Sequence, residues 1–191
     1  MQFEGLSLPG ATSAEGVHDS DQSLVRAAQN GDRSAFGALY QRYARMVHGI
    51  LLARVPRAAA EDLVQDVFLQ ALPRLSSLRD ASRFGGWLAV IARNRANDYY
   101  RQKGPATQCE DEFCEDSGAG ARPRLGQLED GLFLLEAIRS LPETYREPLI
   151  LRFVEGMTGP EIAARTGMKH GSVRVNLHRG MQMLRERIGR K

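Results

Sequence analysis

The sequence predicts an all-α protein of two small helical domains joined by a flexible acidic linker, and three observations lead to this fold class. Apolar residues recur every three or four positions over 21–103 and 131–191, and neither range alternates as a β-strand does. Between them, residues 104–130 combine Gly, Pro and seven acidic residues without an apolar stripe, as extended linkers do. Residues 1–20 also lack apolar periodicity and predict a flexible leader.

Capping and helix-breaking residues set the expected helix boundaries. In the first domain, Asp32 is expected to cap the second helix and Pro73 to close the third. The helices expected there cover residues 20–30, 33–55, 58–72 and 82–103. The helices expected in the second domain cover residues 128–139, 142–155, 160–165 and 171–188.

Charge is distributed unevenly along the chain. The leader, first domain, linker and second domain carry net charges of −3, +6, −5 and +5, which together give the +3 of the whole chain. Basic domains attract polyanions, and nucleic acid is the commonest such partner. Arg-rich surfaces also occur on proteins that bind no nucleic acid. Charge alone therefore does not decide whether this protein binds nucleic acid.

The two cysteines and the N-terminal residues indicate where the protein works. Cys109 and Cys114 have no His nearby in sequence and are too few for a secreted disulfide framework, so we expect no metal site and no cofactor. The first twenty residues hold three acids and no basic signal-peptide segment, and the longest uncharged apolar stretch, 46–53, is too short to span a membrane. We therefore expect a cytoplasmic protein without membrane insertion.

A helix-turn-helix pattern occurs in the second domain. Thr158 stands three residues before Glu161, as in a capping box at a helix start. Ala163, Gly167 and Val173 follow with the spacing of a close helix crossing, a left-handed turn and an apolar anchor. The second helix would direct a polar face outward, suited to a major groove: Ser172, Arg174, Val175, His178 and Arg179. A plain helical hairpin with a solvated basic face is the alternative.

The third and fourth helices of the first domain each have a distinctive polar face. On the third helix, the face opposite the apolar stripe carries Asp62, Gln65 and Asp66, either as a solvated surface or as a partner surface. On the fourth helix, amides and guanidinium groups suited to base edges and phosphates gather away from the apolar stripe: Arg93, Asn94, Asn97, Asp98 and Arg101. Trp87 offers a ring for base stacking, but we expect a mainly structural role for it.

Two stretches of the chain resemble one known family. Residues 60–68 (AEDLVQDVF), followed by 87–94 (WLAVIARN) and Asp98, resemble region 2 of the extracytoplasmic-function (ECF) group of bacterial sigma factors. Residues 140–185, which include the helix-turn-helix, resemble region 4 of the same group. A helix-turn-helix alone is a weak identifier, but two regions in the right order across an acidic linker are specific.

The resemblance implies a sigma factor that catalyses nothing itself, binds core RNA polymerase and directs promoter recognition, DNA melting and transcription initiation in a stress or envelope response. It implies that Asp62, Gln65 and Asp66 dock on the clamp helices of the largest polymerase subunit. The polar face of the fourth helix would meet the −10 element, and the outward face of the helix-turn-helix would meet the −35 element of promoter DNA. An anti-sigma factor is a common further partner in this family.

Two rival functions follow from parts of the sequence. A helix-turn-helix regulator acting without polymerase would need only the second domain, and it leaves residues 58–103 unexplained. An enzyme would need Glu61, Asp62 and Asp66 as metal ligands, and no His or second carboxylate cluster completes such a site. Val175 departs from the small or basic residues usual in the family, so the preferred −35 sequence stays open.

Overall fold

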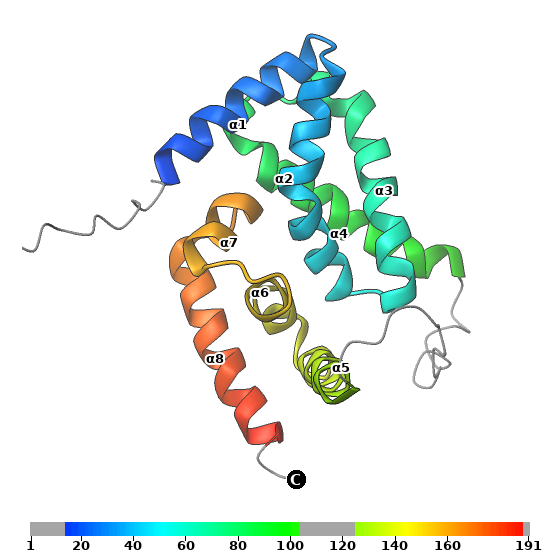
Figure 1. The fold of residues 1–191 in the computed structure, drawn as a ribbon, viewed down its shortest axis with the longest axis vertical. Coiled ribbons are helices and arrows are strands. Elements are labelled where there is room, and N and C mark those ends of the chain that lie inside the picture. The colour runs from blue at the N-terminus through cyan, green and yellow to red at the C-terminus, as the bar shows by residue number, and fades with distance from the viewer. Residues whose placement is uncertain (1–13, 104–124, 189–191) are drawn as a thin grey trace, which may run out of the picture.

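The computed structural model describes the backbone of residues 14–103 and 125–188, which form helices joined by short turns and contain no strand (Figure 1). The first domain consists of α1 (Ala14–Gln29), α2 (Arg33–Leu52), α3 (Arg57–Arg74) and α4 (Phe84–Lys103), with single 3₁₀ turns at Leu75–Ser77 and Ala81–Arg83. The second domain consists of α5 (Leu125–Arg139), α6 (Glu143–Phe153), α7 (Gly159–Thr166) and α8 (His170–Ile188). The all-α prediction with four helices in each domain is confirmed.

Several boundaries differ from the sequence-based expectation. Helix α1 begins at Ala14, inside the predicted leader, and α5 begins at Leu125, inside the predicted linker. Ala and Leu, the first residues of these two helices, favour helix. Helix α3 continues through Pro73 to Arg74, although this proline has no N–H to bond the carbonyl of residue i−4. The rest of the predicted leader and linker, 1–13 and 104–124, lies outside the described residues.

Capping interactions fix the starts of α2 and α7 as the sequence indicates. The carboxylate of Asp32 accepts hydrogen bonds from the backbone N–H groups of Ser34 and Ala35 at 2.8 and 3.2 Å. At α7, the Thr158 hydroxyl accepts from the Glu161 backbone N–H at 3.3 Å, and the Glu161 carboxylate accepts from the Thr158 backbone N–H at 2.8 Å. Hydrogen bonds from the Thr158 backbone N–H and the Thr158 hydroxyl hold the pKa of the Glu161 carboxyl below its usual value. The predicted capping box is confirmed.

The buried apolar residues of the two domains form one continuous core. In the first domain, α1 to α4 enclose fully buried side chains, and Phe84 of α4 packs edge-on against Tyr43 of α2 with ring centroids 5.1 Å apart. Asp21 fastens α1 to α2, because it pairs with Arg42 and accepts a hydrogen bond from the Tyr43 hydroxyl at 2.8 Å. Burial, together with the charge of Asp21, raises the pKa of Tyr43.

In the second domain, α6 lies at the centre and α8 crosses it closely. A Cβ atom on Gly180 would stand 2.9 Å from the Leu149 side chain, so glycine is what allows the two helices to approach. Gly167, between α7 and α8, has a left-handed φ of 72°, as predicted for the turn. Val173 and Leu184 are buried on the inner side of α8. The sequence therefore placed the turn at Gly167 and the apolar anchor Val173 correctly.

The two domains pack directly on each other, a feature that the linker between them did not predict. Helix α6 contacts α2, and α7 contacts α4. Figure 1 shows α6 and α7 lying between α8 and the first domain. The contact includes charged side chains from both domains, so it bears directly on the candidate interfaces.

Candidate nucleic-acid and partner interfaces

A polar concavity of about 400 Å³ lies between α3 and α4. Its lining consists of Gln70, Arg74, Ile91, Asn94, Asn97, Asp98 and Arg101. Four of the five residues predicted on the polar face of α4 are in this set, so the structure brings them together. Amides, one carboxylate and two guanidinium groups offer the donors and acceptors that base edges and phosphates use.

The packing of α4 explains why its polar face stands open. Phe84, Leu88 and Ile91 are buried in the core of the first domain, which turns the opposite side of the helix outward. Asn94 and Asn97 are exposed. Arg101 pairs with Asp98 at 2.8 Å while 80% of its side chain is exposed, and such surface pairs are weak enough to be exchanged for a ligand.

Arg93, the fifth residue predicted on this face, is directed elsewhere. Its Nη2 and Nε atoms lie 2.7 and 3.1 Å from the carboxylate of Glu147, which belongs to α6 of the second domain. Arg93 is not among the residues that line the concavity. The structure therefore separates it from the other four.

Two polar lining residues of the concavity, Gln70 and Arg74, were missed from the sequence. They come from α3 and follow Asp66 at successive intervals of four residues, so all three lie along one side of that helix. A search along this row beyond Asp66 would have found them. The concavity is thus formed by two helices, whereas the sequence indicated one.

The acidic face of α3 is open in part. Asp62 and Gln65 are exposed, and 69% of the neighbouring Leu69 is exposed, which places an apolar side chain beside the charges. Asp66 differs, because its Oδ2 lies 2.7 Å from Nη2 of Arg95 on α4. Asp66 therefore also ties α3 to α4, a structural role that the sequence did not reveal.

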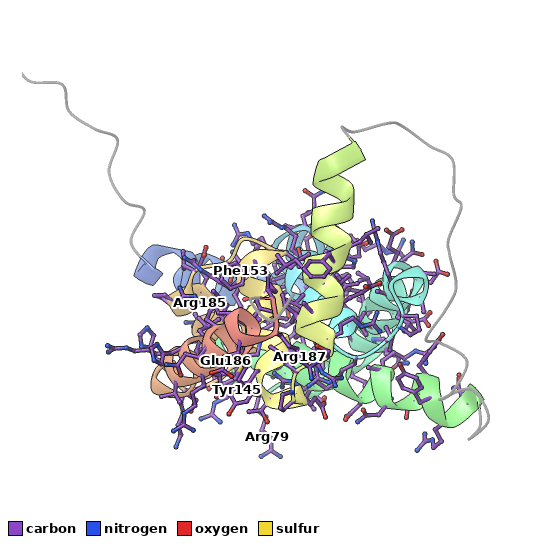
Figure 2. The ribbon with its side chains drawn as sticks, turned by 90° about the horizontal axis from the view of Figure 1, so that it is seen from below. Arg79, Tyr145, Phe153, Arg185, Glu186 and Arg187 are labelled. Carbon is purple, nitrogen blue, oxygen red and sulfur yellow. The ribbon has the colours of Figure 1, made fainter. Side chains whose placement is uncertain are left out.

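The outward face of α8 is as predicted from the helix-turn-helix spacing. All five residues predicted there are exposed: Ser172, Arg174, Val175, His178 and Arg179. A concavity of about 330 Å³ lies between α6 and α8, and its lining includes His178, Phe153 and Arg185. Figure 2 labels Phe153 and Arg185 on this side of the second domain.

The aromatic residues of α4 take part in packing. The Trp87 ring lies 5.8 Å from that of Phe84 and is half-buried against the core. The Tyr100 hydroxyl donates a hydrogen bond to the backbone carbonyl of Arg54 at 2.9 Å. These contacts agree with the mainly structural role expected for Trp87.

Among the residues whose side chains the structure describes, 21–102 and 131–188, no three His, Cys, Asp or Glu gather in a way that would hold a metal ion. None of the helices described there is both long and apolar enough to cross a membrane.

The chain matches two family descriptions that correspond to the two domains. Residues 39–105 match Sigma-70 region 2, and residues 134–184 match Sigma-70 region 4. The fold and both matches define a protein of the sigma-70 class, with α2 to α4 in region 2 and the helix-turn-helix in region 4.

Relatives that align with nearly the whole chain identify its group within the sigma-70 class. The ECF RNA polymerase sigma-E factor of Haemophilus influenzae is 33% identical, and the alignment covers 88% of this chain and 95% of that protein. RNA polymerase sigma factor CarQ of Myxococcus xanthus is also 33% identical, over 84% of this chain and 93% of its own length. The chain belongs to the ECF group of the sigma-70 family, and it is a sigma factor that directs transcription.

Two solved structures are similar in fold. CnrH, in complex with the cytosolic domain of CnrY, superposes with a TM-score of 0.63 at 26% identity, covering 91% of this chain and 99% of that one. The sigma factor RpoE of Bartonella quintana, in complex with the anti-sigma factor NepR, gives a TM-score of 0.52 at 28% identity. That match covers 78% of this chain and 91% of that one.

Proposed function

We propose that this sigma factor binds core RNA polymerase through α3, opens the −10 element at the α3–α4 concavity and binds the −35 element with α8. The observation that carries this proposal is the placement of two exposed polar surfaces on separate domains, one a concavity and one a helix face. The two shapes suit two states of DNA, an unstacked base and an intact major groove. The protein has no catalytic activity of its own in this proposal.

The concavity suits a base that has left the duplex. Extracting a base from its stack costs a few kcal/mol, which a polar pocket must offset by hydrogen bonds to the base edge. Asn94 and Asn97 offer amides that both donate and accept, while Arg101 and Arg74 offer positive charge to the adjacent phosphates. Bases held there would keep the non-template strand apart from its partner.

The face of α8 suits duplex DNA. A recognition helix places its N-terminal residues against base edges in the major groove, and here Ser172, Arg174 and Val175 lie in the first two turns. Arg side chains bind guanine or phosphate, whereas Val175 offers an apolar contact for a thymine methyl group. Specificity at the −35 element would then come from α8 alone.

The polymerase-binding role belongs to Asp62, Gln65 and Asp66, with the clamp helices of the largest subunit as the partner surface. Exposed charges set binding rate and orientation, while a neighbouring apolar group adds buried area on association. Leu69 is such a group, since it stands exposed beside the acids. The three polar residues and Leu69 together form a mixed surface suited to a protein partner.

The setting of this activity is also part of the proposal. The protein would work in the cytoplasm, where polymerase is found, and direct a stress or envelope response. CnrH and RpoE were solved with CnrY and the anti-sigma factor NepR, respectively, which supports an anti-sigma factor as a further partner for this chain. A helix-turn-helix regulator acting without polymerase is not favoured, because region 2 is matched as well as region 4.

Reconstituted transcription tests the proposal. Purified chain is added to core RNA polymerase, DNA bound by the resulting holoenzyme is sequenced, and a promoter found in this way is transcribed in vitro. We expect transcription that depends on both chain and core, with permanganate-reactive thymines at the −10 element. A chain that binds the same DNA equally well without core, and leaves it unmelted, would instead be a regulator.

A further inference from the structure

Asp98 is the one acidic side chain that lines the concavity between α3 and α4. It is 36% exposed, and its Oδ1 atom lies 2.8 Å from Nη2 of Arg101. Exposed ion pairs of this kind contribute little to stability. A carboxylate also repels the phosphates of DNA, so it is unsuited to binding the backbone. Within a DNA-binding concavity, contact with a base is the role that a carboxylate suits.

The ion pair with Arg101 occupies only part of the hydrogen-bonding capacity of Asp98. A carboxylate donates no hydrogen bond and can accept about four, two on each oxygen. The contact with Arg101 is made by Oδ1. Oδ2 and the second lone pair of Oδ1 therefore remain able to accept from a ligand, while the charge of Arg101 offsets that of Asp98 beside the DNA backbone.

Asn94 and Ile91 complete a surface on which a base could lie. Asn94 precedes Asp98 by one turn of α4, and side chains at this spacing are about 5–6 Å apart at Cβ. Its exposed amide both donates and accepts hydrogen bonds. Ile91 lines the same concavity, and an apolar side chain can contact the flat face of an unstacked base. This wall therefore offers acceptors at Asp98, a donor at Asn94 and an apolar surface at Ile91.

Guanine is the base that matches two acceptors beside a donor. Its Watson–Crick edge carries two adjacent donors, N1–H and the 2-amino group, next to the acceptor O6. Cytosine and adenine place a ring-nitrogen acceptor beside their amino group, and thymine has a carbonyl oxygen on each side of its single N–H. A carboxylate placed against any of these three meets an acceptor and is repelled. Against guanine it accepts two parallel hydrogen bonds, the stronger arrangement.

We infer that the concavity selects guanine at one position of the non-template strand of the −10 element. Asp98 accepts from N1–H and from the 2-amino group, and the Asn94 amide donates to O6. The inference rests on the proposed function, in which this concavity holds an unstacked base, and it adds the identity of that base. Asp98 is then a specificity-determining residue, because it rejects the other three bases as well as binding guanine.

Holoenzyme assembled from the full chain and core polymerase tests the inference on promoter DNA that is already melted at the −10 element. Each non-template base of the element is changed in turn to the other three, and retention of the holoenzyme on the DNA is measured. The melted template removes the cost of opening the duplex, so differences between bases report capture of the base alone. We expect one position at which guanine is retained roughly tenfold better than each other base.

Two base analogues at that position test which atoms are recognised. Hypoxanthine keeps N1–H and O6 but lacks the 2-amino group, so retention should be about fivefold weaker than with guanine. 7-Deazaguanine keeps the whole Watson–Crick edge and is altered only on the opposite side of the ring, so it should behave as guanine does. This comparison uses the wild-type chain and does not depend on the folding of a variant.

A substitution then tests whether Asp98 is the residue that reads these atoms. Asp98→Asn replaces one acceptor by a donor, so the preference for guanine over the other bases and over hypoxanthine should fall to within about twofold. Glu61→Gln is the matched control, because it removes an exposed carboxylate of α3 that does not line the concavity. The control should keep both preferences, and circular dichroism checks that both variants are folded.

The outcomes separate guanine selection from the proposed function. If the holoenzyme is retained on the DNA but no position prefers guanine, the selection is wrong and the proposed function stands. A guanine preference that persists in folded Asp98→Asn, or that does not distinguish guanine from hypoxanthine, would overturn the role of Asp98. Failure of the wild-type holoenzyme to be retained on any melted template would contradict the proposed function, and the inference with it.

Discussion

The two helices proposed to contact DNA, α4 and α8, differ in how many of their polar side chains form contacts within the protein. On α4, Arg93 and Arg95 hold Glu147 and Asp66, and their side chains are 28% and 15% exposed. On α8, every residue of the predicted DNA-binding face is exposed, and the buried residues lie on the opposite side. Substitutions on α8 therefore isolate DNA binding, whereas those on α4 affect packing and DNA binding together.

The difference follows from where each helix lies in its domain. Helix α4 contacts α2 and α3 of its own domain and α7 of the second domain, so few positions on it face solvent alone. Helix α8 packs mainly on α6 and α7, which leaves one side free. A recognition helix needs such a free side to enter a groove, while a pocket for a single base needs walls from neighbouring helices.

The largest effect is expected on α8, where the double substitution Arg174→Ala, Arg179→Ala removes two base or phosphate contacts. Each lost contact typically costs about 1–3 kcal/mol, so affinity for the −35 element should fall roughly a hundredfold while urea denaturation is unchanged. Arg185→Ala, further along α8, is the control and should retain discrimination between −35 sequences. An equal loss of discrimination in Arg185→Ala would contradict the assignment of −35 recognition to this face of α8.

A smaller effect, roughly tenfold, is expected for Asn94→Ala on α4, because its amide would hold an unstacked base. Open-complex formation on duplex promoter should fall, and a template already melted at the −10 element should restore most of it. The α8 double variant should gain nothing from the melted template. Permanganate footprints on both templates measure this, and an unaltered footprint for Asn94→Ala would remove it from the −10 surface.

The sequence predicted the helices and the α8 face well because both depend on local rules. Capping by Asp32 and Thr158, and the left-handed turn at Gly167, are set by residues within a few positions of each other. The exposed face of α8 follows from its apolar spacing, since a helix with one buried side leaves the other side to solvent.

The sequence did not predict contacts between residues far apart in the chain. The pairing of Arg93 with Glu147 spans 54 positions, and that of Arg95 with Asp66 spans 29. Helical periodicity places an arginine on a face but does not say which acid stands opposite. The same limit applies to the concavity. Its α4 side was predicted, because Asn94 and Asp98 lie on one helix, but its α3 side, which includes Gln70, was not.

Because arginines of α4 form ion pairs within the protein, some substitutions on α4 should lower the unfolding free energy, whereas those on the exposed face of α8 should not. Arg95→Ala removes the partner of Asp66 at a largely buried position, so unfolding free energy should fall by about 1–2 kcal/mol in urea denaturation. Arg101→Ala breaks an equivalent pair with Asp98 that is mostly exposed, and it should cost under about 0.5 kcal/mol. Equal costs for the two would contradict the difference in packing between these arginines.

The smallest effects are expected at Gln70 and Arg74, the α3 wall of the concavity, and they test whether it acts as one site. Each change to Ala should lower open-complex formation about threefold, in line with one lost hydrogen bond. Arg74→Ala should also lower the salt dependence of binding by about one unit of slope, because a phosphate contact releases counterions, whereas Gln70→Ala should leave that slope unchanged.

Arg57→Ala, an exposed arginine at the other end of α3, is the matched control and should change neither quantity. If Gln70→Ala and Arg74→Ala behave like this control while Asn94→Ala is defective, α4 alone contacts the −10 element.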